Sequence, residues 1–228
     1  MVRKDAALVI ALTLIASEAC AAPTYGTDML KRGKVAIGYQ NNIVFRHDLS
    51  DSYGYIKSDQ HFFYISYGVY DWLSVCGKAG MADLIQKGGG HPKVSYGYGF
   101  AGGYGFRIRA YNNTKEKIRI VLGFHHISVH PVDSSWNSDK YESVLDDWQA
   151  SLAGSKDIGA ITPYVGIKFS KFDLVYKVNE MDRKRRPPEN FVGLVTGITV
   201  RFRDDLSARV EAHFFDETAL STGAYYTY

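Results

Sequence analysis

Apolar residues alternate with polar or small residues along much of the chain. The stretch 62–84 reads FFYISYGVYDWLSVCGKAGMADL, and the alternation runs up to Asp71 and resumes after it. Successive side chains of a strand point to opposite faces, so two such runs joined by a tight turn indicate an antiparallel hairpin. A soluble β-sandwich would show this pattern, and so would a barrel in lipid, where one face meets hydrocarbon and the other a narrow lumen.

The stretch 94–110 favours the barrel. One face carries large residues, namely Tyr96, Tyr98, Phe100, Tyr104, Phe106 and Ile108. The other carries small residues and two arginines, namely Ser95, Gly97, Gly99, Ala101, Gly103, Gly105, Arg107 and Arg109. Aromatic side chains in lipid and glycines against a crowded lumen explain both rows. A soluble periplasmic barrel or sandwich remains an alternative, and it would need another element to cover the aromatic row.

The remaining patterns complete an all-β fold. We expect a closed antiparallel up-and-down transmembrane β-barrel of about ten strands, with eight strands as the alternative. Further strands are expected at 34–44, 117–125, 148–152, 161–169, 192–201, 206–214 and 220–228. Short turns at Asp71, Asn112, Lys156 and Asp204 alternate with longer polar loops, including 47–59 and 173–190. Short periplasmic turns and long outer loops are usual in outer-membrane barrels.

The N-terminus has the features of a cleavable leader. Arg3 and Lys4 precede an apolar run at 6–16, and Ala19-Cys20-Ala21 forms a cleavage site. We therefore expect a signal peptide at 1–21, a short periplasmic lead-in at 22–32, and one barrel domain over 22–228. A lipid anchor at Cys20 is the alternative interpretation. No later window holds about 20 consecutive apolar residues, so an exported chain that spans a membrane would do so as a closed barrel.

The composition agrees with a membrane β-barrel, and the charge argues against a nucleic-acid-binding protein. The chain contains 17 Tyr and 22 Gly, which suits closely packed strands with aromatic girdles. Its formal net charge is only +3 and its basic residues form no single long tract, so a nucleic-acid partner is not expected.

Two stretches carry a family resemblance. The segment GVYDWLSVCGKAG at 68–80 and the segment LSARVEAHFF at 206–215 resemble small bacterial outer-membrane β-barrel proteins of the opacity-protein and OmpA-barrel type. The terminal Tyr228, with Tyr226 two residues before it, is similar to the C-terminal signal read by the barrel-insertion machinery. The resemblance implies a fold and a bacterial outer-membrane location. It implies no catalytic residues, since one fold serves many functions.

The expected lumen face is basic. Alternation directs toward it Lys78, Arg107, Arg109, Lys117, Arg119, Lys168, Arg201 and Arg209, with Glu211 as the clearest acid. A filled lumen or an anion-permeable pore would each explain this row. Barrels of this strand number are just wide enough for side chains, which favours filling. Buried cations need partners, and Asp83, Asp146 and Asp147 are candidates for that role.

Chemistry at a rim is the remaining alternative. His125, His126 and His130 cluster near Asp133, but His125 and His126 point to opposite faces of a strand. We therefore expect no catalytic residue, metal site or cofactor. The basic run Arg183, Lys184, Arg185 and Arg186 is expected in a surface loop, where it is either simply solvated or suited to lipopolysaccharide phosphates.

The sequence thus predicts a non-enzymatic outer-membrane barrel with a structural or surface-interaction role. A narrow anion-permeable channel is the first alternative and a rim enzyme the second. Expected partners are outer-membrane lipid, lipopolysaccharide and, during assembly, the insertion machinery.

Overall fold

The computed structural model describes residues 26–90, 92–179 and 181–228. Their strands, in chain order, are β1 (Val35–Leu49), β2 (Gly54–Tyr70), β3 (Leu73–Lys87), β4 (Val94–Asn113), β5 (Ile118–Val132), β6 (Ser134–Trp136), β7 (Asp139–Lys156), β8 (Ile161–Val178), β9 (Lys184–Arg186), β10 (Val192–Arg201), β11 (Leu206–Phe214) and β12 (Glu217–Thr227). The expected signal peptide falls outside the described residues.

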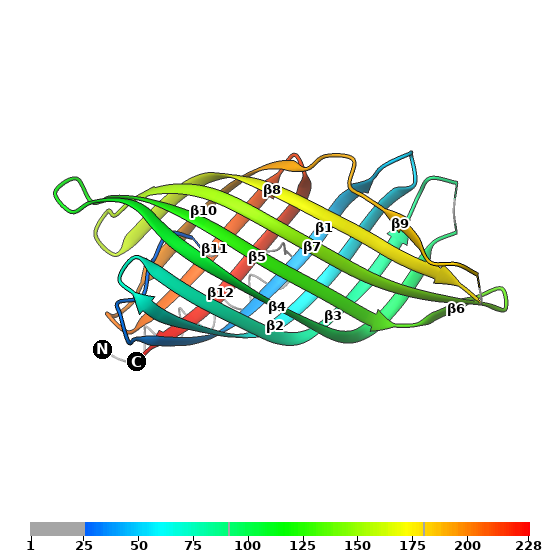
Figure 1. Ribbon diagram of the computed structural model, residues 1–228, viewed down its shortest axis with the longest axis horizontal. Coiled ribbons are helices and arrows are strands. Elements are labelled where there is room, and N and C mark those ends of the chain that lie inside the picture. Colours follow the sequence, from blue (N-terminus) through cyan, green and yellow to red (C-terminus); the bar gives the residue numbers. More distant parts are fainter. Residues whose placement is uncertain (1–25, 91, 180) are drawn as a thin grey trace.

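Ten of these strands form a closed antiparallel barrel. Consecutive long strands pair with one another, including β5 with β7 past the short β6 and β8 with β10 past the short β9, and β1 pairs with β12 to close the sheet. Both described chain ends and the short turns lie at one end of the barrel (Figure 1). The prediction of a ten-stranded all-β barrel is confirmed.

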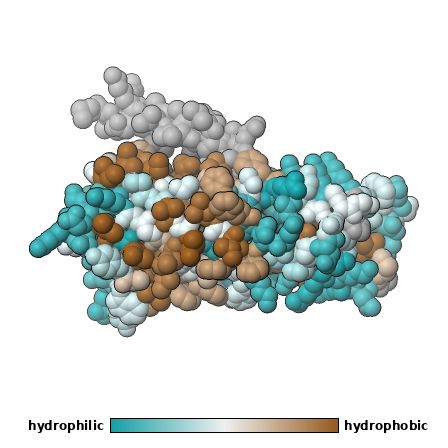
Figure 2. All heavy atoms as spheres, turned by 90° about the horizontal axis from the view of Figure 1, so that it is seen from above, coloured by the Kyte–Doolittle hydropathy of each residue, from teal (hydrophilic) through white to brown (hydrophobic). Residues whose placement is uncertain are grey.

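An apolar belt surrounds the half of the barrel near the chain ends. Figure 2 shows it as a brown band between a small polar end and a larger polar half. Its exposed side chains include Phe63, Ile65, Phe100, Tyr104, Val165 and Ile167. On β8 the outward apolar side chains run from Ile161 to Phe169 and end at Lys171. Nine strand residues at a usual tilt span about 23 Å of height, close to the apolar band of outer-membrane barrels. The fold is therefore that of an outer-membrane β-barrel.

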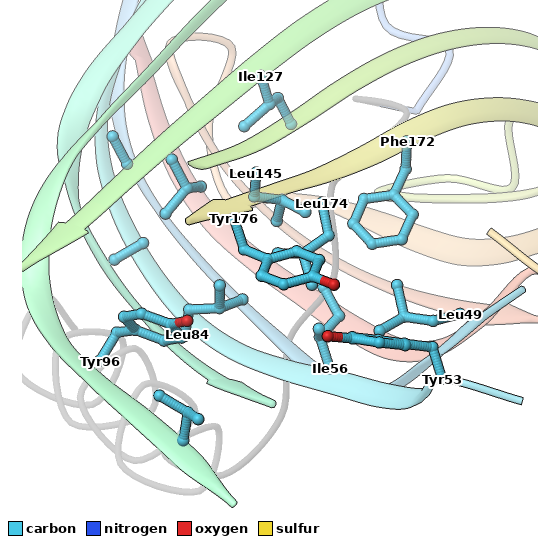
Figure 3. Close-up of a cluster of buried hydrophobic side chains, with 14 of the residues drawn as sticks. Leu49, Tyr53, Ile56, Leu84, Tyr96, Ile127, Leu145, Phe172, Leu174 and Tyr176 are labelled. Carbon is cyan, nitrogen blue, oxygen red and sulfur yellow. The ribbon is translucent and has the colours of Figure 1, made fainter. Parts of the chain in front are cut away.

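The other half of the barrel rises beyond the belt. Its strands continue well past the 9–11 residues that typically cross a bilayer, and β4 alone has 20 residues. This upper half encloses a hydrophobic core, drawn in Figure 3, that includes Phe62, Leu84, Tyr96, Phe172 and Leu174. The interior thus contains an apolar core where the outer surface is polar, with buried Ser58, Gln60 and Gln86 among its inward side chains.

A short segment completes the wall of the upper half. Strands β10, β11 and β12 have only 10, 9 and 11 residues and do not reach it. The segment 184–189, which we call the strap, crosses the gap instead. Within it β9 pairs with β8, Pro188 forms a bridge with Leu49 of β1, and the Glu189 amide donates to the Asp48 carbonyl at 3.0 Å. The strap closes the sheet a second time, above the three short strands.

A β-bulge in β4 changes one expected face. The four residues of β4 from Gly97 to Phe100 lie opposite only three residues of β5, His130 to Val132, and the register with β3 shifts at the same place. The extra residue reverses the alternation, so Tyr96 points into the core at 2% exposure while Tyr98 points outward. The expectation that Tyr96 faces lipid was therefore wrong, because strict period two fails at a bulge.

Two expected loops contain regular structure. β1 continues to Leu49 and β2 begins at Gly54, so only four residues of the expected loop at 47–59 lie between the strands. Likewise β8 runs to Val178 and β9 lies within the expected loop at 173–190. The polar residues of these two stretches led to the prediction of loops. They belong instead to strands that continue above the membrane, where the outer face of the barrel meets water.

Replacing Phe172 tests whether the upper core stabilises the barrel. Phe172 is 1% exposed, so Phe172→Ala should lower the free energy of unfolding by about 3–5 kcal/mol, measured by urea titration in detergent. Val175→Ala, on the outer face of the same strand, is the control and should cost well under half as much. Equal losses would show that the upper core adds no special stability.

Candidate functional site: the polar lumen and its mouth near the chain ends

At belt height the lumen holds a buried ionic network centred on Lys168. The Lys168 ammonium on β8 is 2.8 Å from the Asp216 carboxylate and also pairs with Glu217. Nδ1 of His213 lies 3.2 Å from the same ammonium. Lys168 and His213 are fully buried. A cation removed from water needs such partners, and here the turn between β11 and β12 supplies both carboxylates.

Two chains of contacts extend this network across the lumen. Nε2 of His213 lies 2.9 Å from Glu211, which accepts a 2.6 Å hydrogen bond from the Tyr164 hydroxyl. On the other side the Ser170 hydroxyl donates to Asp147 at 2.7 Å, and the Gln149 amide donates to the same carboxylate. The barrel strands are therefore joined through their inward polar side chains as well as through their backbones.

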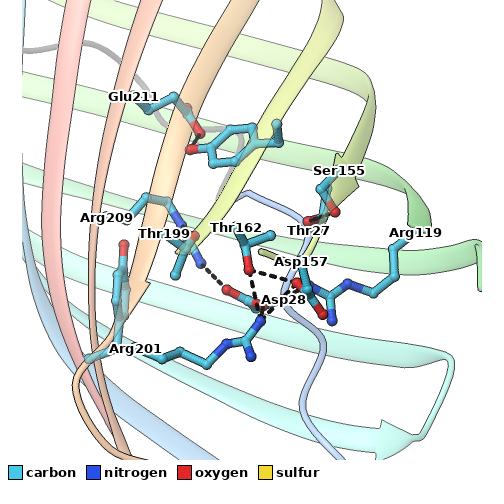
Figure 4. Close-up of polar contacts among 12 residues, drawn as sticks. Thr27, Asp28, Arg119, Ser155, Asp157, Thr162, Thr199, Arg201, Arg209 and Glu211 are labelled. Atoms are coloured by element: carbon cyan, nitrogen blue, oxygen red, sulfur yellow. Dashed lines mark hydrogen bonds and ion pairs between the residues drawn. The ribbon is translucent and has the colours of Figure 1, made fainter. Parts of the chain in front are cut away.

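Below the network, the chain's own N-terminal segment enters the barrel mouth. Thr27 is fully buried and its hydroxyl donates to that of Ser155 at 2.6 Å. The next residue, Asp28, lies among three arginines (Figure 4). Its carboxylate is 3.1 Å from Arg119, 3.5 Å from Arg201 and 3.9 Å from Arg209. Part of the expected periplasmic lead-in thus lies inside the mouth.

Asp157, in the turn between β7 and β8, completes this cluster. Its carboxylate lies 2.6 Å from Arg119 and 2.9 Å from Arg201, and it accepts a hydrogen bond from Thr162 at 2.6 Å. Burial raises the pKa of Asp157, but the Thr162 hydrogen bond and the two guanidinium charges outweigh burial and lower that pKa below its usual value. Asp157 therefore stays ionised at neutral pH and holds the two arginines together.

The structure brings together most of the expected basic row, although not all of it. Lys78, Arg107, Lys168 and Arg209 are buried, as is Glu211. Arg109, Arg119 and Arg201 are half-buried toward the end of the barrel where the chain ends lie. Lys117 is exposed in the turn before β5, with a φ of 57°, so placing it on the lumen face was wrong. Strand alternation did not apply to it, because it precedes the strand.

The small residues of β4 make room for this interior. A Cβ at Gly105 would overlap the His125 ring, and one at Gly103 would lie 3.2 Å from Cε of Lys78. The Lys78 ammonium in turn lies 4.2 Å from the centre of the Phe62 ring, a cation–π distance. The glycine row therefore lets large inward side chains from β3 and β5 approach the β4 backbone.

The histidines do not converge on one site. His125 is buried in the lumen, whereas His126 points outward, 2.5 Å from Asp146 and stacked near Trp148. Asp146 is therefore no lumen acid, and Asp83 likewise lies outside the lumen, where it accepts from the Asp59 amide. Among the described residues, no group of three or more His, Cys, Asp and Glu is arranged to hold a metal ion.

The sequence analysis did not identify three acids that pair with the buried lysine and with the arginines at the mouth, namely Asp28, Asp216 and Glu217. Asp216 lies in the turn between β11 and β12 and Asp28 precedes the first strand, so no alternation marked these two residues, and Glu217 begins β12, which was expected to start only at 220. Glu217 could have been found by counting inward positions backward from Tyr225 in steps of two. No pattern indicated that Asp28 enters the mouth.

The basic run and the C-terminal tyrosines lie at opposite ends. Arg186 stacks over Tyr53, 4.6 Å from the ring centre, and lies 3.7 Å from Asp51, so it helps to hold the strap. Arg185 lies 3.7 Å from Asp173, and the described Arg183 and Lys184 are exposed. Tyr226 and Tyr228 pack edge to face at the end of the barrel where the chain ends lie, with ring centroids 4.8 Å apart.

Comparisons with known proteins give low similarities to outer-membrane barrels. No family model matches the chain, and no curated protein matches it. One similar solved structure is the translocator domain of the autotransporter NalP from Neisseria meningitidis, at 9% identity and a TM-score of 0.49, covering 89% of this chain and 90% of that one. Another is the outer membrane protease OmpT from Escherichia coli, at 9% identity and a TM-score of 0.46, covering 90% and 100%. The β domain of the Bordetella autotransporter BrkA follows at 14% identity and 0.41, covering 88% and 99%. Similarities this low support no particular function.

Removing Lys168 tests the buried network. Lys168→Met leaves Asp216 and Glu217 without their cation, so it should lower the free energy of unfolding by about 3–5 kcal/mol, measured by urea titration in detergent.

The double variant Lys168→Met/Glu217→Gln should recover part of that loss, because one uncompensated charge is gone. A Lys168→Met barrel as stable as the parent would show that the network contributes nothing to stability. A double variant less stable than the single one would contradict the charge explanation.

Proposed function

We propose that the protein is a non-conducting, non-enzymatic outer-membrane barrel that holds a rigid surface outside the cell for structural or interaction purposes. The observation that carries this proposal is the sealed upper lumen. Leu84, Phe172 and Leu174 are at most 1% exposed and belong to one apolar cluster that extends beyond the membrane belt. An ion that crosses this cluster would give up its water against apolar and aromatic side chains, so its passage is costly.

The outer face of the upper half fits an exposed role. Above the belt the outward residues include Lys57, Lys140, Glu142, Lys171 and Lys177, in contrast to the apolar belt below. Cations just above a lipid belt suit the phosphates of lipopolysaccharide, which we propose as the neighbouring partner. Arg186 already contacts Tyr53 and Asp51 within the barrel. Lys171 and Arg185 are therefore better candidates for this contact than the four basic residues at 183–186 taken together.

The location and the assembly route belong to the same proposal. A cleavable signal peptide would deliver the chain to the periplasm, and the terminal Tyr228 would present it to the insertion machinery. The belt and the closed sheet support the bacterial outer membrane as its destination. Membership of the opacity-protein and OmpA-barrel type is proposed on the two sequence segments alone.

Electrical recording tests the sealed lumen. The refolded protein in a planar bilayer should give no stepwise conductance in KCl, while a porin of known conductance reports that the bilayers work. Heat-dependent migration on gels confirms that the inserted protein is folded. Stepwise currents whose anion preference reverses in Arg107→Glu would instead establish the anion channel.

Cysteine labelling on intact cells tests the exposed role. In a Cys76→Ser background, Ser135→Cys at the top of the barrel should react with a membrane-impermeant maleimide. Thr114→Cys, in the turn between β4 and β5, should react only after the outer membrane is permeabilised, and the Cys76→Ser parent gives the background. Labelling of Thr114→Cys but not of Ser135→Cys on intact cells would place the upper half in the periplasm. That result would refute the proposal that this half is exposed outside the cell.

A further inference from the structure

The periplasmic mouth contains a cavity with an excess of positive charge. The cavity measures about 480 Å³ and lies between the N-terminal segment, the turn between β10 and β11, and the lower lumen. Seven Lys or Arg side chains and three aspartates line it. Even with Asp157, which pairs with two of the arginines, the described side chains leave the site positive. A volume of this size is typical of small-molecule sites.

The arrangement around Asp28 shows what such a site selects. One carboxylate lies within 4 Å of three guanidiniums that come from three different strands, β5, β10 and β11. Guanidinium groups bind planar or tetrahedral oxyanions through paired N–H donors. The buried Nε of Arg119 has no hydrogen-bond partner among the described residues, so one donor of this cluster is unused. Asp28 thus occupies a position built for an oxyanion but supplies only one negative charge.

We propose that this cavity is a binding site for a multiply charged, phosphate-bearing anion that enters from the periplasm. Arg119, Arg201 and Arg209 would hold its phosphate, and Asp28 would be displaced or would share the arginines with it. Asp28 follows Thr27, whose hydroxyl group binds Ser155 on the wall. A small shift of Asp28 would take its carboxylate away from the three guanidiniums, while Asp157 would stay paired with Arg119 and Arg201. The site lies below the sealed core and does not require passage through the lumen.

This cavity lies apart from the surface on which the proposed function rests, so anion binding can be tested independently of that function. The phosphate group could belong to a soluble periplasmic molecule or to the headgroup of an inner-leaflet phospholipid. Inorganic pyrophosphate serves as the probe for the shared chemistry.

Titration calorimetry of the refolded full chain, at constant ionic strength in a zwitterionic detergent, measures pyrophosphate binding. The parent should bind saturably, and Arg201→Gln should weaken binding by about tenfold or more. Asp28→Asn should tighten binding by about tenfold, because it removes the competing carboxylate. Lys115→Gln, an exposed cation in the turn between β4 and β5 that does not line the cavity, is the matched control and should change affinity less than about twofold.

Gel mobility without boiling verifies that each variant is folded. Absence of saturable binding by both the parent and Asp28→Asn would overturn the proposal, as would equal weakening by Arg201→Gln and Lys115→Gln. Nanodiscs distinguish the two sources of phosphate. Weaker pyrophosphate binding in phosphatidylglycerol than in phosphatidylcholine discs supports a lipid headgroup as the ligand, and equal binding supports a soluble one.

Discussion

Closure of the sheet is the constraint on which the rest of this structure depends. Inside a bilayer every strand edge must be paired, because no water is present to satisfy its N–H and C=O groups. Pairing of β1 with β12 meets this need at belt height. Above the belt the same problem returns, because β10, β11 and β12 end early, and the strap there pairs with β8 and bridges to β1. The lower closure allows the protein to span a membrane, and the upper one encloses a hydrophobic core outside it.

The same strands have an apolar outer face in the lower half of the barrel and a polar outer face in the upper half. In the lower half the outside is apolar, so the polar residues that alternate with it point inward and must find partners there. Lys168 finds them in Asp216 and Glu217. In the upper half the outside is polar and the alternating residues build an apolar interior around Phe172 and Leu174. The apolar core of the upper half is therefore a consequence of strands that continue past the membrane.

Charge is balanced unevenly along the axis of the barrel. The central cation is paired within a network fully shielded from water, where an unpaired charge would be costly. At the mouth near the chain ends, where water reaches the side chains, cations exceed carboxylates around the cavity that Asp28 enters. Partial solvation permits that excess, and the excess makes the mouth the region of this barrel best suited to an anion.

The sequence by itself determined the all-β architecture and most of the strand faces, because period-two alternation is local and follows directly from backbone geometry. It also indicated a basic lumen through Arg107, Lys168 and Arg209. Only the tertiary structure showed that Asp28 and Asp216 also neutralise lumen cations, since these acids come from the chain's beginning and from a turn. It alone revealed the bulge that turns Tyr96 inward and the strap at Pro188. A bulge depends on the register between neighbouring strands, and a closure depends on how far each strand extends, so neither is encoded in the pattern of any one segment.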